Sequence, residues 1–146
     1  MSTTSSASQG TPKRAEPESF RARGLSVSLT VKDLEKSLAW YCDVVGFTLD
    51  RKDERDGQAY AASLKAGGAR LRLNKDDGAK GWDRVKGVGI SLFFTTAQDI
   101  DAMAKGIEQA GGSLAMQPKD MPWGARMFKL VDPDGFMLSI ASIPAE

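Results

Sequence analysis

Two arginines lie two residues apart in the segment ARLRLN, at positions 70 and 72. If this segment is a strand, Arg70 and Arg72 share one face and the leucines between and after them lie on the other. A guanidinium group offers a planar set of N–H donors that suits a carboxylate or a phosphate. The pair therefore predicts a site for an anionic or carbonyl-rich ligand. The alternative is that one arginine lies at the rim and pairs with an acid such as Asp50 or Asp76.

The groups that usually carry out acid–base or metal chemistry are scarce. The chain has no histidine and a single cysteine, Cys42. Histidine is the commonest metal ligand and the commonest general base, and one cysteine cannot form an intrachain disulfide. Cys42 falls within a predicted helix with no histidine to activate it, so we interpret it as a small, buried or half-buried side chain rather than a nucleophile.

Composition excludes several classes of partner. The 146 residues are 41% hydrophobic and 27% charged, with 20 basic and 19 acidic side chains. This balance creates no field that would attract nucleic acid or an anionic membrane, so neither partner is expected. No apolar run approaches the roughly 18 residues of a membrane span, and the N-terminus lacks the apolar core of a signal peptide. A cytoplasmic location is expected by default.

The chain divides into a tail and one domain. Residues 1–23 are rich in Ser, Thr, Pro and charge and offer too little apolar surface to offset the entropy of ordering, which predicts a flexible N-terminal tail. Residues 24–143 form the predicted domain. In its first half, alternation predicts a strand over 25–31, and Asp33 is placed to cap a helix over 34–45. Three more strands are predicted over 47–52, 59–66 and 69–74.

The second half repeats this order. The distance from Asp33 to Gly46 is 13 positions, and so is the distance from Asp99 to Gly112, which places the two halves in register at a constant offset of 66. A duplicated βαβββ module is the economical explanation. The expected elements of this half are a strand over 89–96, a helix over 99–110, and strands over 113–117, 125–131 and 136–142. The modules then span about 24–76 and 87–143, with a linker at about 77–86.

Two such modules predict an α+β domain. Each helix covers the outer face of its strands and leaves the other face of a curved mixed sheet to line a cleft. Functional side chains are therefore expected on the face that the helices do not cover.

The repeat, together with LTVKDLEKSLAWYCDVVGF and PWGARMFKLVDPDGFMLSI, resembles the vicinal oxygen chelate superfamily. This superfamily includes glyoxalase I, extradiol dioxygenases, methylmalonyl-CoA epimerase, fosfomycin-modifying enzymes and bleomycin resistance proteins. The resemblance covers residues 24–143. In the superfamily's enzymes four strand positions, two in each module, supply His, Gln or Glu to a divalent metal.

By this resemblance, the four positions fall at Ser26, Arg72, Ser91 and Ser139, and a slip of one residue at the third gives Ile90. Serine hydroxyls are weak ligands, and a guanidinium has no lone pair to donate. No metal and no other cofactor is therefore expected. Without a metal the isomerase, dioxygenase and epimerase mechanisms lose their Lewis acid, so the resemblance implies the fold but not that chemistry.

One branch of the superfamily, the bleomycin resistance type, is metal-free and sequesters a drug in a cleft shared between two subunits. The stretch PWGARMFKLVDPDG is similar to the PWG loop of that branch running into its turn. The drug-binding members carry an acidic residue soon after PWG, where this chain has Arg126 and Met127. The difference argues against cationic bleomycin itself as the ligand.

The predicted cleft combines hydroxyls, guanidinium groups and apolar surface. Hydroxyls can orient a ligand without activating water, or they are small fillers of a vestigial cleft. The indole of Trp123, in a loop, is placed to stack on a flat ligand, or else it covers the sheet edge or a dimer contact. The predicted lining residues are Ser26, Ser28, Tyr60, Arg70, Arg72, Ser91, Trp123, Met137 and Ser139.

Three functions stay open. The leading hypothesis is a metal-free, homodimeric protein that captures a small anionic or aromatic molecule, such as an antibiotic or a toxic metabolite. The second is an enzyme of the same fold, of glyoxalase, lyase, isomerase or dioxygenase type, that acts on a small carbonyl compound and either still uses a metal or uses Arg72 as its electrophile. The third is an interaction or regulatory module whose cleft is vestigial.

Overall fold

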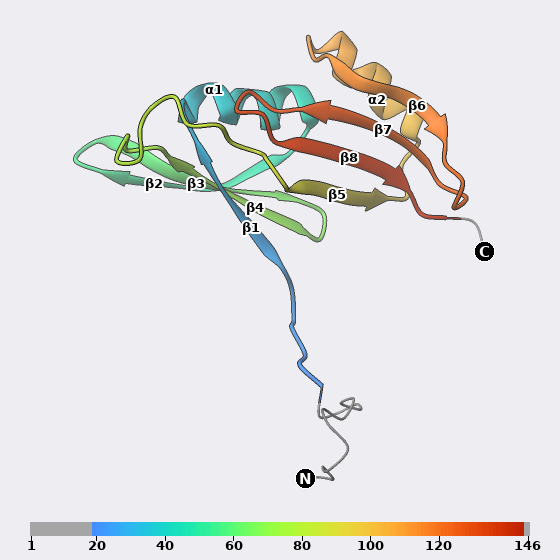
Figure 1. Cartoon of the computed structure of the whole chain (residues 1–146), viewed down its shortest axis with the longest axis horizontal. Coiled ribbons are helices and arrows are strands. Elements are labelled where there is room, and N and C mark those ends of the chain that lie inside the picture. The colour runs from blue at the N-terminus through green and yellow to red at the C-terminus, as the bar shows by residue number, and fades with distance from the viewer. Residues whose placement is uncertain (1–18, 145–146) are drawn as a thin grey trace.

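A computed structural model describes residues 19–144 (Figure 1). Residues 1–18 of the predicted tail lie outside the described residues, and residues 19–25 run away from the body of the molecule ahead of the first strand. Among residues 19–144, no helix is long and apolar enough to cross a membrane. The elements are β1 (Ser26–Val31), α1 (Leu34–Ala39), η1 (Trp40–Val45), β2 (Thr48–Arg55), β3 (Gln58–Ala66), β4 (Ala69–Lys75), β5 (Ser91–Thr96), α2 (Ile100–Gln109), β6 (Leu114–Asp120), β7 (Arg126–Val131) and β8 (Met137–Ser142).

The eight strands form two sheets of the same topology. The first sheet has the order β1-β4-β3-β2 and the second has the order β5-β8-β7-β6. β1 runs parallel to β4, and β5 runs parallel to β8. The other neighbouring strands are antiparallel. The predicted α+β fold with two βαβββ modules is confirmed. The predicted curved sheet is divided into two separate sheets of four strands.

The two aspartates that define the repeat cap their helices, as predicted. The Asp33 carboxylate accepts a hydrogen bond from the backbone N–H of Lys36 at 3.1 Å, and Asp99 caps α2 through Ala102 at 3.0 Å. Each cap satisfies one of the N–H groups that a helix start leaves without an intrahelical partner.

The first helix differs from the prediction in its second half. The sequence predicts an α-helix over 34–45, but α1 ends at Ala39 and Trp40–Val45 form the π-helical turn η1. Six residues are too few for the spacing of apolar side chains to distinguish the two helix types. The predicted stop is at Gly46, whose φ of 110° is in the left-handed region.

The helix-facing sides of both sheets share one hydrophobic core. Leu64 and Leu73 of the first sheet and Leu130 and Leu138 of the second are fully buried in the same cluster. The rings of Phe47 and Phe94 meet edge to face across the two modules, at 5.8 Å between centroids. Both helices lie on one side of the strands in Figure 1, so the open faces of both sheets are turned away from this core.

A buried hydrogen-bond network joins the modules where the β7–β8 turn meets the first helix. The Tyr41 hydroxyl donates to Asp132 Oδ2 at 2.7 Å. Asp132 Oδ1 accepts the backbone N–H of Asp134 and of Phe136, at 2.9 and 2.8 Å. Asp134 Oδ1 in turn accepts the backbone N–H of Lys32, at 2.8 Å. The turn thereby fixes the end of β1 and the start of α1 against the second module.

The linker contributes a lysine to the same seam. The ammonium of Lys86 lies 2.8 Å from Asp76 Oδ2 and 3.6 Å from Asp134 Oδ1, and all three side chains are almost fully buried. The Lys86 ammonium is the main cause of the lowered pKa of Asp76, followed by the backbone N–H of Gly78. The ion pair ties the linker to both modules at once.

The Tyr41–Asp132 hydrogen bond should be measurable in stability. Burial raises the pKa of Asp132, and the Tyr41 hydroxyl opposes this by stabilising the charged carboxylate. Tyr41→Phe should lower the free energy of unfolding by about 1–3 kcal/mol at pH 7. Because the lost bond is to the charged form, Asp132 should titrate at a higher pH in the variant, and the difference from wild type should narrow as the solution is acidified.

Urea unfolding at pH 7 and pH 3.5 measures this difference, with Tyr60→Phe as the matched control because Tyr60 is exposed. The control should stay within about 0.5 kcal/mol of wild type at both pH values. An equal effect of the two substitutions would contradict the assignment.

Candidate functional site

Arg72 lies on the open face of the first sheet and is held by three side chains. Its Nε donates to Asn74 Oδ1 and its Nη1 donates to Ser63 Oγ, both at 3.2 Å. Its Nη2 lies 2.8 Å from Asp53 Oδ2. The side chain is partly buried, so these contacts fix the orientation of the guanidinium.

The acid that pairs with Arg72 is not one of the two suggested by the sequence. Asp50 lies 3.7 Å from Lys65, and Asp76 belongs to the Lys86 network. Asp53 is the partner because it lies in β2 opposite Ala61, whose neighbour across the sheet is Asn74. The sequence predicted this strand to end at residue 52, whereas β2 continues to Arg55, so Asp53 was left out of the expected face.

Asp53 is shared between two guanidinium groups. Arg51 Nε lies 2.9 Å from Asp53 Oδ1. The hydrogen bond from Arg72 is the main cause of the lowered pKa of Asp53, and Arg51 lowers it further. Strand pairing places Arg51, Lys65, Arg70 and Arg72 on the same face. Two carboxylates, Asp50 and Asp53, pair with cations of this set, so the face keeps an excess of positive charge.

The other predicted residues of the first sheet also lie on its open face. Ser26 and Ser28 pair in register with Arg70 and Arg72. Ser28 Oγ accepts a hydrogen bond from Asn74 Nδ2 at 2.6 Å. Arg70 Nη1 donates hydrogen bonds to the carbonyl oxygens of Gly67 and Ala69, so this guanidinium is held against the β3–β4 turn. The structure therefore brings Ser26, Ser28, Arg70 and Arg72 together.

Tyr60 lies at a β-bulge. Asp53 pairs with Ala61 and Glu54 pairs with Ala59, which leaves Tyr60 as an extra residue in β3. The guanidinium carbon of Arg55 lies over the Tyr60 ring, 4.8 Å from the ring centroid, and Tyr60 is 40% exposed. Because a bulge interrupts alternation, the spacing from which Tyr60 was assigned to the cleft does not apply at this position.

The open face of the second sheet carries apolar side chains together with one lysine, Lys129, which pairs with Ser139. Ser91 pairs with Met137, and Phe93 pairs with Ser139. Ser91 is exposed and Met137 partly buried, whereas Ser139 is only 4% exposed and is covered by its neighbours. Phe93, in contrast, is 56% exposed. Phe93 was missed as a site residue although it is in phase with Ser91.

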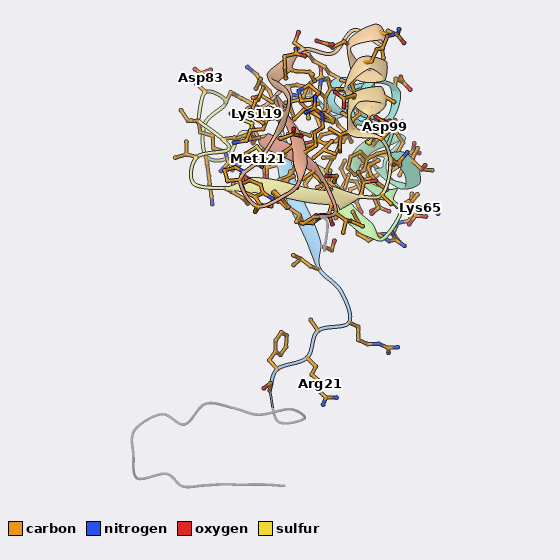
Figure 2. All side chains as sticks on the ribbon, turned by 90° about the vertical axis from the view of Figure 1, so that its right-hand side faces the viewer. Arg21, Lys65, Asp83, Asp99, Lys119 and Met121 are labelled. Carbon is orange, nitrogen blue, oxygen red and sulfur yellow. The ribbon has the colours of Figure 1, made fainter. Side chains whose placement is uncertain are left out.

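Trp123 lies in the β6–β7 loop and is 50% exposed. The loop is a tight turn, in which Gly124 has a φ of 93° and donates its N–H to the carbonyl of Met121. Met121 packs on a small cluster formed by Ala125, Met127 and Ala141, and Figure 2 shows it beside the second sheet.

The four positions singled out by the resemblance are divided between the sheets. Ser26 and Arg72 lie on the first sheet, and Ser91 and Ser139 lie on the second. Within the described residues 19–144, no hydrogen bond or ion pair links one pair to the other. Two cavities in the described part of the chain lie elsewhere, one at the start of α1 and one at the β3–β4 turn.

This arrangement can be compared with known proteins. A family described as "Glyoxalase/Bleomycin resistance protein/Dioxygenase superfamily" matches residues 25–140. The chain belongs to this superfamily. The match spans both modules, so the family resemblance seen in the motifs is confirmed.

Named relatives in the superfamily are distant. A "Probable lactoylglutathione lyase" of Vibrio cholerae is 30% identical over 124 residues, covering 81% of this chain and 88% of the relative. A protein of the same name in Synechocystis is 29% identical over 122 residues, covering 80% and 92%.

Solved structures support the same fold. A superfamily member from Sphaerobacter thermophilus has a TM-score of 0.65 at 27% identity and covers 84% of this chain and 98% of its own. TioX from Micromonospora has a TM-score of 0.68 at 20% identity and covers 83% and 98%. The second likeness concerns the fold alone.

The residues that the resemblance assigns to the superfamily's ligand positions do not fit a divalent metal. Three are serines and the fourth is Arg72. The nearby carboxylate, Asp53, is already engaged by two arginines. Within residues 19–144 no group of three or more His, Cys, Asp or Glu side chains could hold a metal ion. Cys42 offers no alternative, because burial and then Asp43 raise the pKa of its thiol.

We expect added metal to leave the protein unaffected. Purified protein should contain far less than one equivalent of Zn, Ni, Co or Fe by elemental analysis. Its unfolding temperature should not change with 100 µM Zn²⁺ or Ni²⁺ or with a chelator, because a ligand that binds the native state with a Kd near 1 µM would stabilise it by about 2.7 kcal/mol at that concentration. One equivalent of metal, removed by chelation with loss of stability, would contradict this reading.

Proposed function

We propose that the protein binds a small molecule that combines an anionic or carbonyl group with a flat apolar portion, and that it does so without a metal. The observation that supports this most directly is the guanidinium of Arg72. The resemblance assigns it to a position where enzymes of the superfamily carry a metal ligand, and three side chains hold it in place.

Arg72 retains donors for a ligand. A guanidinium has five N–H groups, of which Nη1 and Nη2 carry two each. Ser63 and Asp53 each engage one of these terminal nitrogens. One N–H on each nitrogen is left for a carboxylate, sulfonate or carbonyl oxygen. Because the side chain is already ordered, binding loses less conformational entropy than it would with a mobile arginine.

The apolar portion of such a ligand fits the second sheet. Its open face carries Phe93 and Val131, both largely exposed, together with Met137. A charged face and an apolar face on separate sheets suit an amphipathic ligand if the two faces are opposed. We propose that a second copy of the chain opposes them, so that the first sheet of one copy covers the second sheet of the other.

An enzymatic function is the second candidate. It is favoured by the relatives named as probable lactoylglutathione lyases at 29–30% identity. In this alternative, Arg72 would polarise a carbonyl oxygen through its N–H groups, without a metal. Isomerisation of a methylglyoxal–glutathione adduct that is abolished by Arg72→Ala would favour the enzyme over the binding protein.

The binding proposal can be tested with 8-anilinonaphthalene-1-sulfonate, a flat aromatic anion whose fluorescence rises in apolar surroundings. We expect binding in the micromolar range. Arg72→Ala should weaken it about tenfold or more, because a hydrogen bond to a charged group contributes roughly 1.5–3 kcal/mol. Asp53→Asn should tighten it, because the competing carboxylate charge is removed.

Lys80→Ala is the matched control, since Lys80 is an exposed cation in the linker and its loss changes the net charge equally. Opposite effects of Arg72→Ala and Asp53→Asn distinguish a site from general destabilisation, which would move both in the same direction. Unchanged affinity in Arg72→Ala would refute the role of this residue.

The proposed pairing of two copies should be visible in solution. Phe20 is 90% and Leu25 82% exposed on the segment that extends from β1, and Figure 2 shows this segment, with Arg21 labelled, away from the folded body of strands and helices. Such apolar exposure is typical of an interaction surface. Sedimentation equilibrium should show a dimer at micromolar concentration, and Phe20→Asp with Leu25→Asp should raise its dissociation constant at least about tenfold. A wild-type monomer at 100 µM would rule out this pairing.

A further inference from the structure

The β3–β4 turn, strand β5 and helix α2 enclose a groove of about 890 Å³. Gly67 and Gly68 form one wall, Phe93 and Phe94 a second, and Met103 with Gly106 a third. In Figure 2, Lys65 near the end of β3 and Asp99 ahead of α2 are labelled on this side of the molecule. None of the nine residues predicted for the cleft lines the groove.

The groove exists because the two modules differ at equivalent places. The β7–β8 turn, Asp132–Gly135, docks on the first module and inserts the carboxylate of Asp134 beside Lys32. The equivalent β3–β4 turn is only Gly67–Gly68, which is shorter and carries no side chain. The β3–β4 turn therefore makes no contact with the second module like the one that the β7–β8 turn makes with the first.

The helices differ in the same direction. By the offset of 66 residues that relates the modules, Gly106 of the second module is equivalent to Trp40 of the first, and Ile107 is equivalent to Tyr41. Trp40 packs against the core, whereas Gly106 leaves open space, because a Cβ added to it would have no neighbour within 4 Å. A missing indole and a shortened turn together leave the groove unfilled.

The lining of the groove is electrically neutral. It contains 17 residues, none of them ionisable, in a chain that is 27% charged. The other cavity, at the start of α1, has six ionisable residues among eleven. The backbone N–H of Gln98, equivalent to that of Lys32, is already bonded to Thr96 Oγ1 at 3.1 Å. The groove thus has no charged partner for an ionic ligand.

We propose that this groove is a second binding site, which takes a small uncharged aromatic molecule. Its volume is within the range of ligand sites, about 300–1,000 Å³. Phe93, Phe94 and Met103 offer the ring faces and the polarisable sulfur that aromatic ligands contact well. Gly67 and Gly68 allow a flat molecule to approach the backbone closely. Thr95 and Gln98 supply neutral groups that can hydrogen-bond to it.

The groove is separate from Arg72, which does not line it, although Phe93 belongs both to the groove and to the open face of the second sheet. Charge distinguishes their ligands, since the Arg72 face is cationic and the groove is neutral. The pair of probes N-phenyl-1-naphthylamine and 8-anilinonaphthalene-1-sulfonate exploits this difference, because the two molecules differ by one sulfonate group.

The test uses fluorescence titration of the full chain with N-phenyl-1-naphthylamine. Gly106→Leu places a side chain in the groove, and because Leu is a better helix former than Gly the helix should be retained. We expect micromolar binding to wild type, a loss of tenfold or more in Gly106→Leu, and no change in Arg72→Ala. Ala102→Leu is the control, because it adds an apolar side chain to an exposed position of the same helix outside the groove.

Equal binding by wild type and Gly106→Leu would overturn the proposal, and so would equal losses in Gly106→Leu and Ala102→Leu. Loss of the neutral probe in Arg72→Ala would show one shared site and would also overturn it. If the probe is excluded as the protein dimerises, the groove is filled by a second copy rather than by a small molecule. If the sulfonate probe still binds through Arg72 while the neutral probe does not bind, only the second site is refuted.

Discussion

The buried hydrogen bond from Tyr41 to Asp132 sets the relation between the two halves of the molecule. A carboxylate in this position is tolerated because a hydroxyl and two backbone N–H groups satisfy it. The same turn holds the end of β1 and the start of α1, and Lys86 joins it through Asp134. The shared core, the direction of the open faces and the seam all depend on this docking.

The chemistry available on the open faces follows from how that docking orients the sheets. The core takes the helix-facing side chains of both sheets, so charge and exposed apolar surface are left on the opposite sides. On the first sheet, arginines and a lysine outnumber the carboxylates of Asp50 and Asp53, whereas the second presents an exposed Phe93 on the strand beside a buried Ser139. The two modules thus share a topology while offering different surfaces to a ligand.

Much of the fold could be predicted from the sequence because its signals are local and occur twice. Asp33 and Asp99 cap their helices, and alternation identified the strands around Leu71 and Leu92. The partner of Arg72 could not be predicted, because it depends on strand register across a bulge and on the true end of β2. The orientation of Tyr60 and the π-helical turn at Trp40 escaped for the same reason, since an extra residue breaks the spacing on which alternation and helical periodicity rely. The neutral groove had no sequence signal of its own, because its lining comes from five separate segments.

The shortness of the Gly67–Gly68 turn has a consequence for how a duplicated protein can diversify. In a perfectly symmetric dimer of modules, every change would appear at two places, and any opening made for a partner would be made twice. Here one hairpin secures the tertiary structure, so its counterpart is released from that duty and can vary without unfolding the chain. The half of the molecule that contributes least to holding the modules together is the half with the greatest freedom to acquire a new specificity.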